Sequence, residues 1–431
     1  MAGHVEQSSQ LAQTLRARLS QEELSVITQL AGTSGAAGTA APDETEAREK
    51  RYQEILSSML PTLLDRRSWL SRQKDLAPQL LEELLEQPVE RRRVLVRNSP
   101  RFLSRPLCEL LQDRSQDACF RRPPEAVALA QLAVDIADRL SGEAPGAAAV
   151  CDLRARSLGF LANAYRVTSE PQLSEETLDA AELVLEEGGS GDLLETAWLK
   201  SLRANLKGVQ GRLDESLSLF DQAMRIYRRC GEDHLVGRTM ISKAMYFGYA
   251  GDPEQAIRLL RRGLPLIDTQ REPRLALAAN HNLIYYLTDL GHHEEAAELL
   301  DSSRPLYFEL GDRTNLMRLR WLEGRMAREL DKPQEAERAF LETREAFLQE
   351  EMAWDVALVS LELAAVYLQQ GRTAEIKTLA DELLPIFQAT GLHREALASL
   401  ILFQKAAELE KVTTDLIRKT MSRLHSLRRD R

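Results

Sequence analysis

Apolar side chains recur at intervals of three and four residues along most of this chain, which is the spacing of one face of an α-helix. Between residues 192 and 410 these helical segments are joined by five similar polar turns, whose starts are 40 residues apart. The turns read GRLDES at Gly211, GDPEQA at Gly251, GHHEEA at Gly291, DKPQEA at Asp331 and GRTAEI at Gly371. The pattern predicts a repeated unit made of a helix, a short turn and a second helix.

Positions at a fixed distance from each turn share a common character. Seven residues before the turn the side chain is mostly small; nine and sixteen residues after it the side chain is mostly large and apolar. The three sets are Ala204, Ala244, Ile284, Gly324 and Ala364; Phe220, Leu260, Leu300, Phe340 and Ala380; and Tyr227, Ile267, Tyr307, Phe347 and Phe387. Because one hairpin cannot bury its apolar face alone, the units must stack. The predicted fold class is therefore an all-α solenoid of antiparallel helix pairs.

Three of the second helices contain a proline fourteen residues after the turn start, namely Pro265, Pro305 and Pro385. An interior proline removes one backbone hydrogen bond and kinks or breaks a helix. Its recurrence in register predicts a repeated bend that shapes the solenoid.

The remaining composition divides the chain into five regions. Residues 1–30 are predicted to form a small N-terminal helical piece, 31–46 a flexible linker rich in Gly and Ala, and 47–122 a non-repeat helical cap. The solenoid is predicted over 123–410, with weaker repeats before residue 190, and a basic capping helix over 411–431. Its apolar stripe is Val412, Leu416, Thr420, Leu424 and Leu427. The N-terminal piece fits a docking arm, a remnant of a larger module or a disordered end equally well.

Charge and cysteine content narrow the classes of function. The formal net charge of −10 does not favour nucleic acid as the partner. The charge is uneven, because Val89–Arg122 holds nine arginines against four acids. The four cysteines form no C-x-x-C pair, which is typical of a reduced cytosolic protein. No apolar run is as long as a membrane span, and the N-terminus lacks a signal-peptide pattern, so a cytoplasmic location is predicted.

The sequence contains none of the motifs that commonly carry catalysis. G-x-S-x-G, G-x-x-x-x-G-K-[ST], G-x-G-x-x-G, H-E-x-x-H and a cysteine with a nearby histidine motif are all missing. His292 and His293 lie in a turn beside acidic residues, where exposed histidines are common, so no metal site is predicted. We therefore expect no enzyme activity, no cofactor and no catalytic residues.

The repeats resemble tetratricopeptide repeats. The resemblance depends on the small residue before the turn, a turn close to G-x-x-x-E-A, the residue at plus nine and a small residue at plus twelve in four copies. The 40-residue unit is longer than the usual 34, as in the long repeats of bacterial regulatory and adaptor proteins. Phrases such as RRRVLVRNSPRF and REPRLALAANHNL are similar to a group of bacterial members. The resemblance implies a right-handed superhelix that binds a peptide or protein segment along its concave groove.

In that family the first helix of each pair lines the groove, which gives a candidate site in this chain. On the helix 312–330 the side chains of Arg318, Trp321, Arg325 and Arg328 share one arc. Arginine holds carboxylates in a bidentate manner, aromatic rings supply rigid contact area, and asparagine can bond a peptide backbone. The site is thus predicted to take a peptide or partner protein, with an acidic or C-terminal segment as one form. The predicted contacts on the neighbouring units are His281, Asn282, Tyr285, Asn205, Arg238 and Tyr249.

Three alternatives remain open at this stage. The arginines could instead pair with Glu323, Glu329 or acids on neighbouring helices. The basic segment Val89–Arg122 could contact nucleic acid as part of a transcriptional regulator, although it lacks helix-turn-helix spacing. The basic C-terminal helix could meet an acidic face of the solenoid and form a self-assembling scaffold. The sequence does not determine the oligomeric state.

Overall fold

The computed structural model describes residues 68–69, 71–119, 122–140, 146–310, 312–389 and 394–427. The chain divides into two compact units, Met1–Glu86 and Gln87–Arg431. In the first unit a helix covers residues 71–85. The predicted N-terminal helical piece and linker, residues 1–30 and 31–46, lie outside the described residues.

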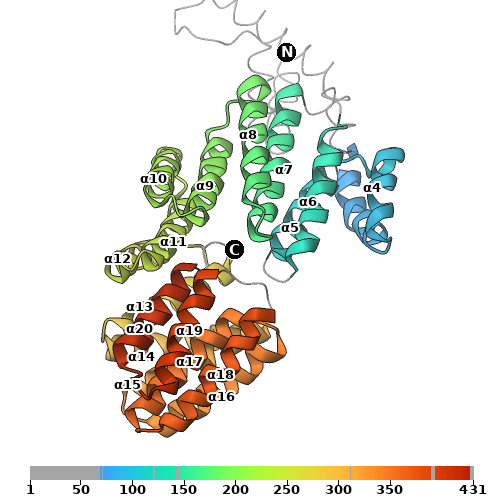
Figure 1. The fold of residues 1–431 in the computed structure, drawn as a ribbon. Helices are drawn as coiled ribbons and strands as arrows, with labels where there is room; N and C mark the ends of the chain where they lie inside the picture. The colour runs from blue at the N-terminus through green and yellow to red at the C-terminus, as the bar shows by residue number, and fades with distance from the viewer. Residues whose placement is uncertain are drawn as a thin grey trace, which may run out of the picture. The chain divides into compact units, whose positions relative to one another are not determined.

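The second unit is built from α-helices, and its described part contains no strand. Three helices precede the repeats: α4 (Val89–Asn98), α5 (Arg105–Ala118) and α6 (Pro123–Ala137). The helix pairs then follow: α7 (Ala147–Val167) with α8 (Pro171–Gly188), α9 (Leu193–Val209) with α10 (Leu213–Cys230), α11 (Asp233–Tyr249) with α12 (Pro253–Gly263), α13 (Pro273–Asp289) with α14 (His293–Glu309), α15 (Arg313–Glu329) with α16 (Pro333–Gln349), α17 (Ala353–Gln369) with α18 (Thr373–Ala389), and α19 (Arg394–Glu408) with α20 (Thr414–Leu427). Figure 1 shows these pairs in chain order.

Each pair turns through the same backbone motif. At the first clear turn, the amide of Arg212 donates to the carbonyl of Lys207 at 2.9 Å, and the amide of Gly211 donates to that of Gly208 at 3.1 Å. Paired bonds of this kind end a helix and require a left-handed residue. Gly211 supplies it with φ of 74°. In the fourth turn Asp331 replaces glycine and takes the same conformation, with φ of 56°.

The repeated core positions whose burial the structure describes are buried as predicted. Phe220 and Phe340 have no exposed surface, and Tyr227 and Tyr307 have almost none. Gly324 lies so close to the Phe340 ring that an added Cβ would be 2.7 Å from it. The small residue before the turn therefore allows the two helices of a pair to approach closely. The all-α solenoid predicted from the 40-residue spacing is confirmed.

The three recurrent prolines have different effects. Pro265 lies in a 3-10 turn, Leu264–Leu266, which follows the shortened helix α12. Pro305 and Pro385 instead lie inside the continuous helices α14 and α18. The shared register therefore does not produce the same local structure, because only Pro265 follows a glycine, Gly263, which packs closely against Gly237 of α11.

The last four helices form a closed group, in which α18 contacts α17 and α19, and α20 contacts both α19 and α17. Figure 1 shows them together in orange and red. Ile417 and Leu424 of α20 are buried in the same core cluster as most of α17. Among the pairs before it, no second helix makes comparable contact with the first helix of the preceding pair. The end of the solenoid therefore departs from the regular repeat.

The cysteines in the described residues are free thiols that differ in burial. Cys108 is fully buried and its Sγ lies 3.4 Å from the Ser157 hydroxyl. Burial raises the pKa of the Cys108 thiol to about 12. Cys230 is exposed at the end of α10. In the described part of the chain, no helix is long and apolar enough to cross a membrane.

Candidate functional site

The predicted site residues lie on the first helices α9, α11, α13 and α15, as their repeat positions require. We call these side chains the predicted groove face: Asn205, Arg238, Tyr249, His281, Asn282, Tyr285, Arg318, Trp321, Arg325 and Arg328. Their exposure and partners differ strongly from one helix to the next, and the difference separates side chains that hold the solenoid together from side chains that solvent can reach.

Trp321 lies in the core. Its side chain is only 6% exposed and meets the Phe347 ring edge-on, with the ring centroids 6.0 Å apart. This placement differs from the predicted projection into a groove. The helical wheel placed Trp321 beside arginines, but it could not show that the second helix of the same pair brings Phe347 against it.

Arg325 is also buried, and its partners come from both neighbouring repeats. Its side chain is 3% exposed and pairs with Asp289 of α13 and with Glu362 of α17, whose Oε1 is 3.2 Å from Arg325 Nε. The guanidinium lies over the Tyr285 ring, 3.8 Å from its centroid. Burial alone would lower the pKa of Arg325, but the nearby Asp289, Tyr285 and Glu362 raise it above the ordinary value. Arg325 therefore stays charged within the protein.

Arg328 completes this charge cluster, in which Arg325 and Glu362 are buried and Asp289 is 41% exposed. It pairs with Glu362, whose side chain is 1% exposed, and with Glu329 at 2.7 Å. The cluster Asp289, Tyr285, Arg325, Arg328 and Glu362 thus joins three successive first helices. Buried charges are tolerated when each has a partner of opposite sign. One alternative was that these arginines pair with acids of the chain itself. For Arg325 and Arg328 this alternative is correct.

His281 and Arg318 both lie near Tyr307 of α14. The Nδ1 atom of His281 is 2.9 Å from the hydroxyl of Tyr307, which is almost fully buried. Burial raises the pKa of Tyr307, and the positive charge of Arg318 lowers it to a lesser extent. Both His281 and Arg318 keep intermediate exposure.

The residues on α9 and α11 are half-exposed and hydrogen-bonded. The Asn205 amide donates to the carbonyl of Ser201 at 2.8 Å, and the hydroxyl of Tyr246 donates to the Asn205 carbonyl at 2.8 Å. Arg238 pairs with Glu272 at 3.1 Å. Tyr249 lies edge-on to Tyr246, with the ring centroids 6.1 Å apart.

Asn282 of α13 is different. Its side chain has intermediate exposure and makes no hydrogen bond to any residue in the described ranges. It lies one helical turn before Tyr285, which also has intermediate exposure. An amide with a free donor and a free acceptor beside an aromatic ring is suited to bind a peptide backbone.

The predicted groove face does not continue onto α17. At the repeat positions of Arg318 and Trp321, this helix has Leu358 and Leu361, and neither has exposed surface. Unlike the earlier first helices, α17 contacts α20. The residue equivalent to Leu358 is half-exposed on α9 and α11 and exposed on α13, whereas the position of Leu361 is already buried at Ile241 and Trp321. The uncovered part of the face therefore lies on α9, α11, α13 and the first half of α15.

Four arginines of the basic segment Val89–Arg122 form ion pairs within the chain: Arg93, Arg97, Arg105 and Arg122. Arg93 and Arg97 of α4 both bind Asp135 of α6, at 2.7 and 3.3 Å. Burial would raise the pKa of the Asp135 carboxyl, but its bonds with these arginines hold the pKa below the ordinary value. Arg105 pairs with Glu109 at 2.8 Å. Charge pairing between α4 and α6 and within α5 accounts for these arginines without nucleic acid.

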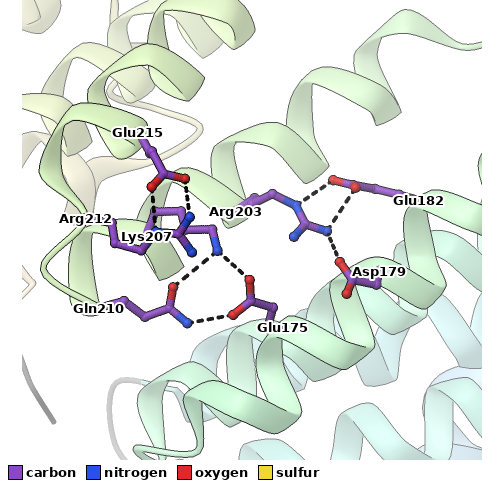
Figure 2. A network of polar contacts seen from close by, with 8 residues as sticks. All are labelled: Glu175, Asp179, Glu182, Arg203, Lys207, Gln210, Arg212 and Glu215. Atoms are coloured by element: carbon purple, nitrogen blue, oxygen red, sulfur yellow. Dashed lines mark hydrogen bonds and ion pairs between the residues drawn. The ribbon is translucent and has the colours of Figure 1, made fainter.

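Sequence reasoning missed a polar network between α8 and α9 (Figure 2). Lys207 is only 5% exposed and pairs with Glu175, whose other oxygen accepts a bond of 2.8 Å from Gln210. Arg203 binds Glu182 at 2.9 Å and Asp179 at 2.7 Å. The sequence did contain a signal for this network, because Lys207 occupies a repeat position that is apolar or aromatic in the later repeats: Phe247, Leu287, Ala327 and Tyr367.

Comparison with known proteins identifies the repeats. Residues 195–268 match the family model described as tetratricopeptide repeat. The chain contains tetratricopeptide repeats. The resemblance stated from the turns and core positions is thereby confirmed.

Several solved tetratricopeptide-like structures share the fold. The Rap protein complexed with Competence and Sporulation Factor is 13% identical, with a TM-score of 0.55, 75% of this chain covered and 87% of that chain. NprR in complex with its cognate peptide NprX is 15% identical, with a TM-score of 0.50 and coverages of 72% and 86%. Aspartyl phosphate phosphatase F from Bacillus subtilis is 15% identical, with a TM-score of 0.51 and 88% of each chain covered. No curated protein sequence matches this chain.

Proposed function

We propose that this chain is a non-enzymatic adaptor that binds a peptide or a segment of a partner protein along its first helices. By binding, it regulates a partner effector or transcription factor. The ligand contacts are Asn205, Arg238, Tyr249, Asn282, Tyr285 and Arg318. Four further residues do not contact the ligand but hold the contact residues and their helices in place: Trp321, Arg325, Arg328 and His281.

One observation carries the proposal. On α9, α11 and α13 the predicted groove face keeps polar and aromatic side chains with intermediate exposure, as at Asn205, Tyr249 and Asn282. On α17, which α20 contacts, the repeat position of Arg318 is instead Leu358, which has no exposed surface. Asparagine and tyrosine on an uncovered face suit the amide groups and side chains of a peptide. Two proteins of similar fold are described in complexes: Rap with Competence and Sporulation Factor, and NprR with its cognate peptide NprX.

The test begins with capture of partners from the source cell by the full chain. The bound segment is then made as a synthetic peptide and titrated calorimetrically into the wild type, Asn282→Ala and Arg238→Ala. Each substitution should raise the dissociation constant by about tenfold or more, as expected for a loss of roughly 1.5 kcal/mol. Glu298→Ala on the exposed side of α14 is the matched control and should bind as the wild type does. Equal affinity in all four proteins would refute the proposed site.

A further inference from the structure

The last first helix, α19, has a second apolar face that nothing in the described chain covers. One face is buried through Leu400, Phe403 and Ala407, which belong to the core cluster at the end of the solenoid. On the opposite side Leu402 and Leu409 are 63% and 64% exposed. They are seven residues apart and therefore lie on one line along the helix. A helix that is apolar on two sides is normally packed on both.

The exposed line of α19 is also basic. Lys405, three residues after Leu402, is exposed and has no ion pair with any described residue. The 3-4 spacing of Leu402, Lys405 and Leu409 is that of a coiled-coil seam, in which a polar residue selects the partner. Lys411 and Arg418 nearby in the sequence are exposed too and likewise form no ion pair within the described ranges. This seam therefore favours an acidic helix with matching apolar positions.

Helix α8 presents such a seam. Leu173, Glu176, Ala180, Leu183 and Glu187 follow the same 3-4 spacing and are all exposed. Leu173 and Leu183 are 42% and 52% exposed. The helix Pro171–Gly188 contains six acidic residues and no basic one.

The acids of α8 fall into two groups. Figure 2 shows Glu175, Asp179 and Glu182 joined to Arg203 and Lys207 of α9. Glu176, Glu186 and Glu187 are exposed and have no ion pair among the described residues. The acids of the seam thus keep their charge available for a basic partner.

We propose that α19 of one molecule packs against α8 of a second copy, so that the line Leu402, Lys405 and Leu409 lies along the line Leu173, Glu176, Ala180, Leu183 and Glu187. Lys405 then faces Glu176 or Glu187, depending on whether the two helices run parallel or antiparallel. The contact is head-to-tail, because the two surfaces are different, and such a contact closes into a ring or continues as a chain. A contact made by one helix from each molecule is small, so association in the micromolar range is expected.

The test uses two variants of the full chain, each with one seam disabled. Leu402→Glu with Leu409→Glu disables α19, and Leu173→Lys with Leu183→Lys disables α8. All four leucines are exposed, so circular dichroism and thermal unfolding should match the wild type. Sedimentation velocity at increasing concentration should show association of the wild type, which weakens at high salt. Each variant alone should remain monomeric, and an equimolar mixture should form a dimer, because one intact α8 and one intact α19 are then present.

Charge reversal gives a second, independent readout. Lys405→Glu should weaken association by about tenfold or more, and its mixture with Glu176→Lys and Glu187→Lys should recover it. A monomeric wild type at all concentrations would overturn the proposal. Association that persists in both seam variants would also overturn it, because the contact would then lie elsewhere. Failure of the mixture to dimerise would exclude the head-to-tail pairing of α8 with α19.

Discussion

Arg325 and Glu362 lie on consecutive first helices with side chains that are 3% and 1% exposed, and their Nε and Oε1 atoms are 3.2 Å apart. Arg328 and Asp289 complete the balance of charge around them. This pair therefore connects α15 to α17 within the interior of the solenoid, and it has a direct consequence for stability.

Removal of one member of this cluster should be strongly destabilising. Glu362→Ala leaves Arg325 and Arg328 without their shared carboxylate, and breaking a buried pair typically costs about 3–5 kcal/mol. The free energy of unfolding from urea titration measures the loss. The exposed Glu408→Ala is the control and should change it by less than about 0.5 kcal/mol. The triple change Arg325→Met, Arg328→Met and Glu362→Leu should recover much of the loss, since no buried charge then lacks a partner. A loss below about 1 kcal/mol for Glu362→Ala would show that the cluster contributes little to stability.

Stability at acid pH should depend on Asp135. Its pKa is lower in the folded protein than in the unfolded chain, so its contribution is present above the unfolded value of about 4 and is lost as pH falls through the folded value. Asp135→Asn should therefore lower the free energy of unfolding at pH 7, by about 1 kcal/mol because solvent screens the exposed arginines. The difference from the wild type should disappear near pH 2. An equal difference at both pH values would mean that packing, and not charge, is responsible.

The sign of the stability change caused by Gly324→Ala shows whether helix propensity or packing dominates at this position. In an exposed helix this change stabilises by about 1 kcal/mol. In this structure the added Cβ would be 2.7 Å from the Phe340 ring, so a destabilisation of about 1–3 kcal/mol is expected. Thermal unfolding measures the direction. In a chain that also carries Phe340→Leu, Gly324→Ala should be less destabilising, because the smaller side chain leaves room for the methyl group.

The cysteines should react at very different rates with a thiol reagent. Cys230 is exposed, whereas Cys108 is buried and its pKa is raised to about 12. The thiolate is the reactive form, so Cys108 should stay unmodified in the native protein at pH 8 and react only after unfolding. Mass spectrometry of the digested protein locates the label. Rapid native labelling of Cys108 would show that α5 opens readily.

Several features of the candidate site could be predicted from the repeat alone, and others could not. The 40-residue period placed Asn205, Tyr285 and Arg325 at the same position of the first helices α9, α13 and α15. It could not tell that Arg325 is buried and Asn205 is half-exposed, because that depends on what the neighbouring helices carry. Glu362 is 37 residues beyond Arg325, and only stacking of α17 on α15 brings their side chains together.

The sequence by itself determined the helix pairs, their turns and the buried apolar positions that recur seven residues before and nine and sixteen residues after each turn. These follow from local rules: a left-handed residue ends each first helix, and residues three and four apart share a face. Only the tertiary structure decided where α20 packs and which helix faces stay exposed. The apolar stripe of α20 was evident in Leu416 and Leu424, but a stripe does not name its partner, because hydrophobic burial has no direction. The contact of α20 with α17 therefore had to be observed, and so did the exposed leucines of α19 and α8.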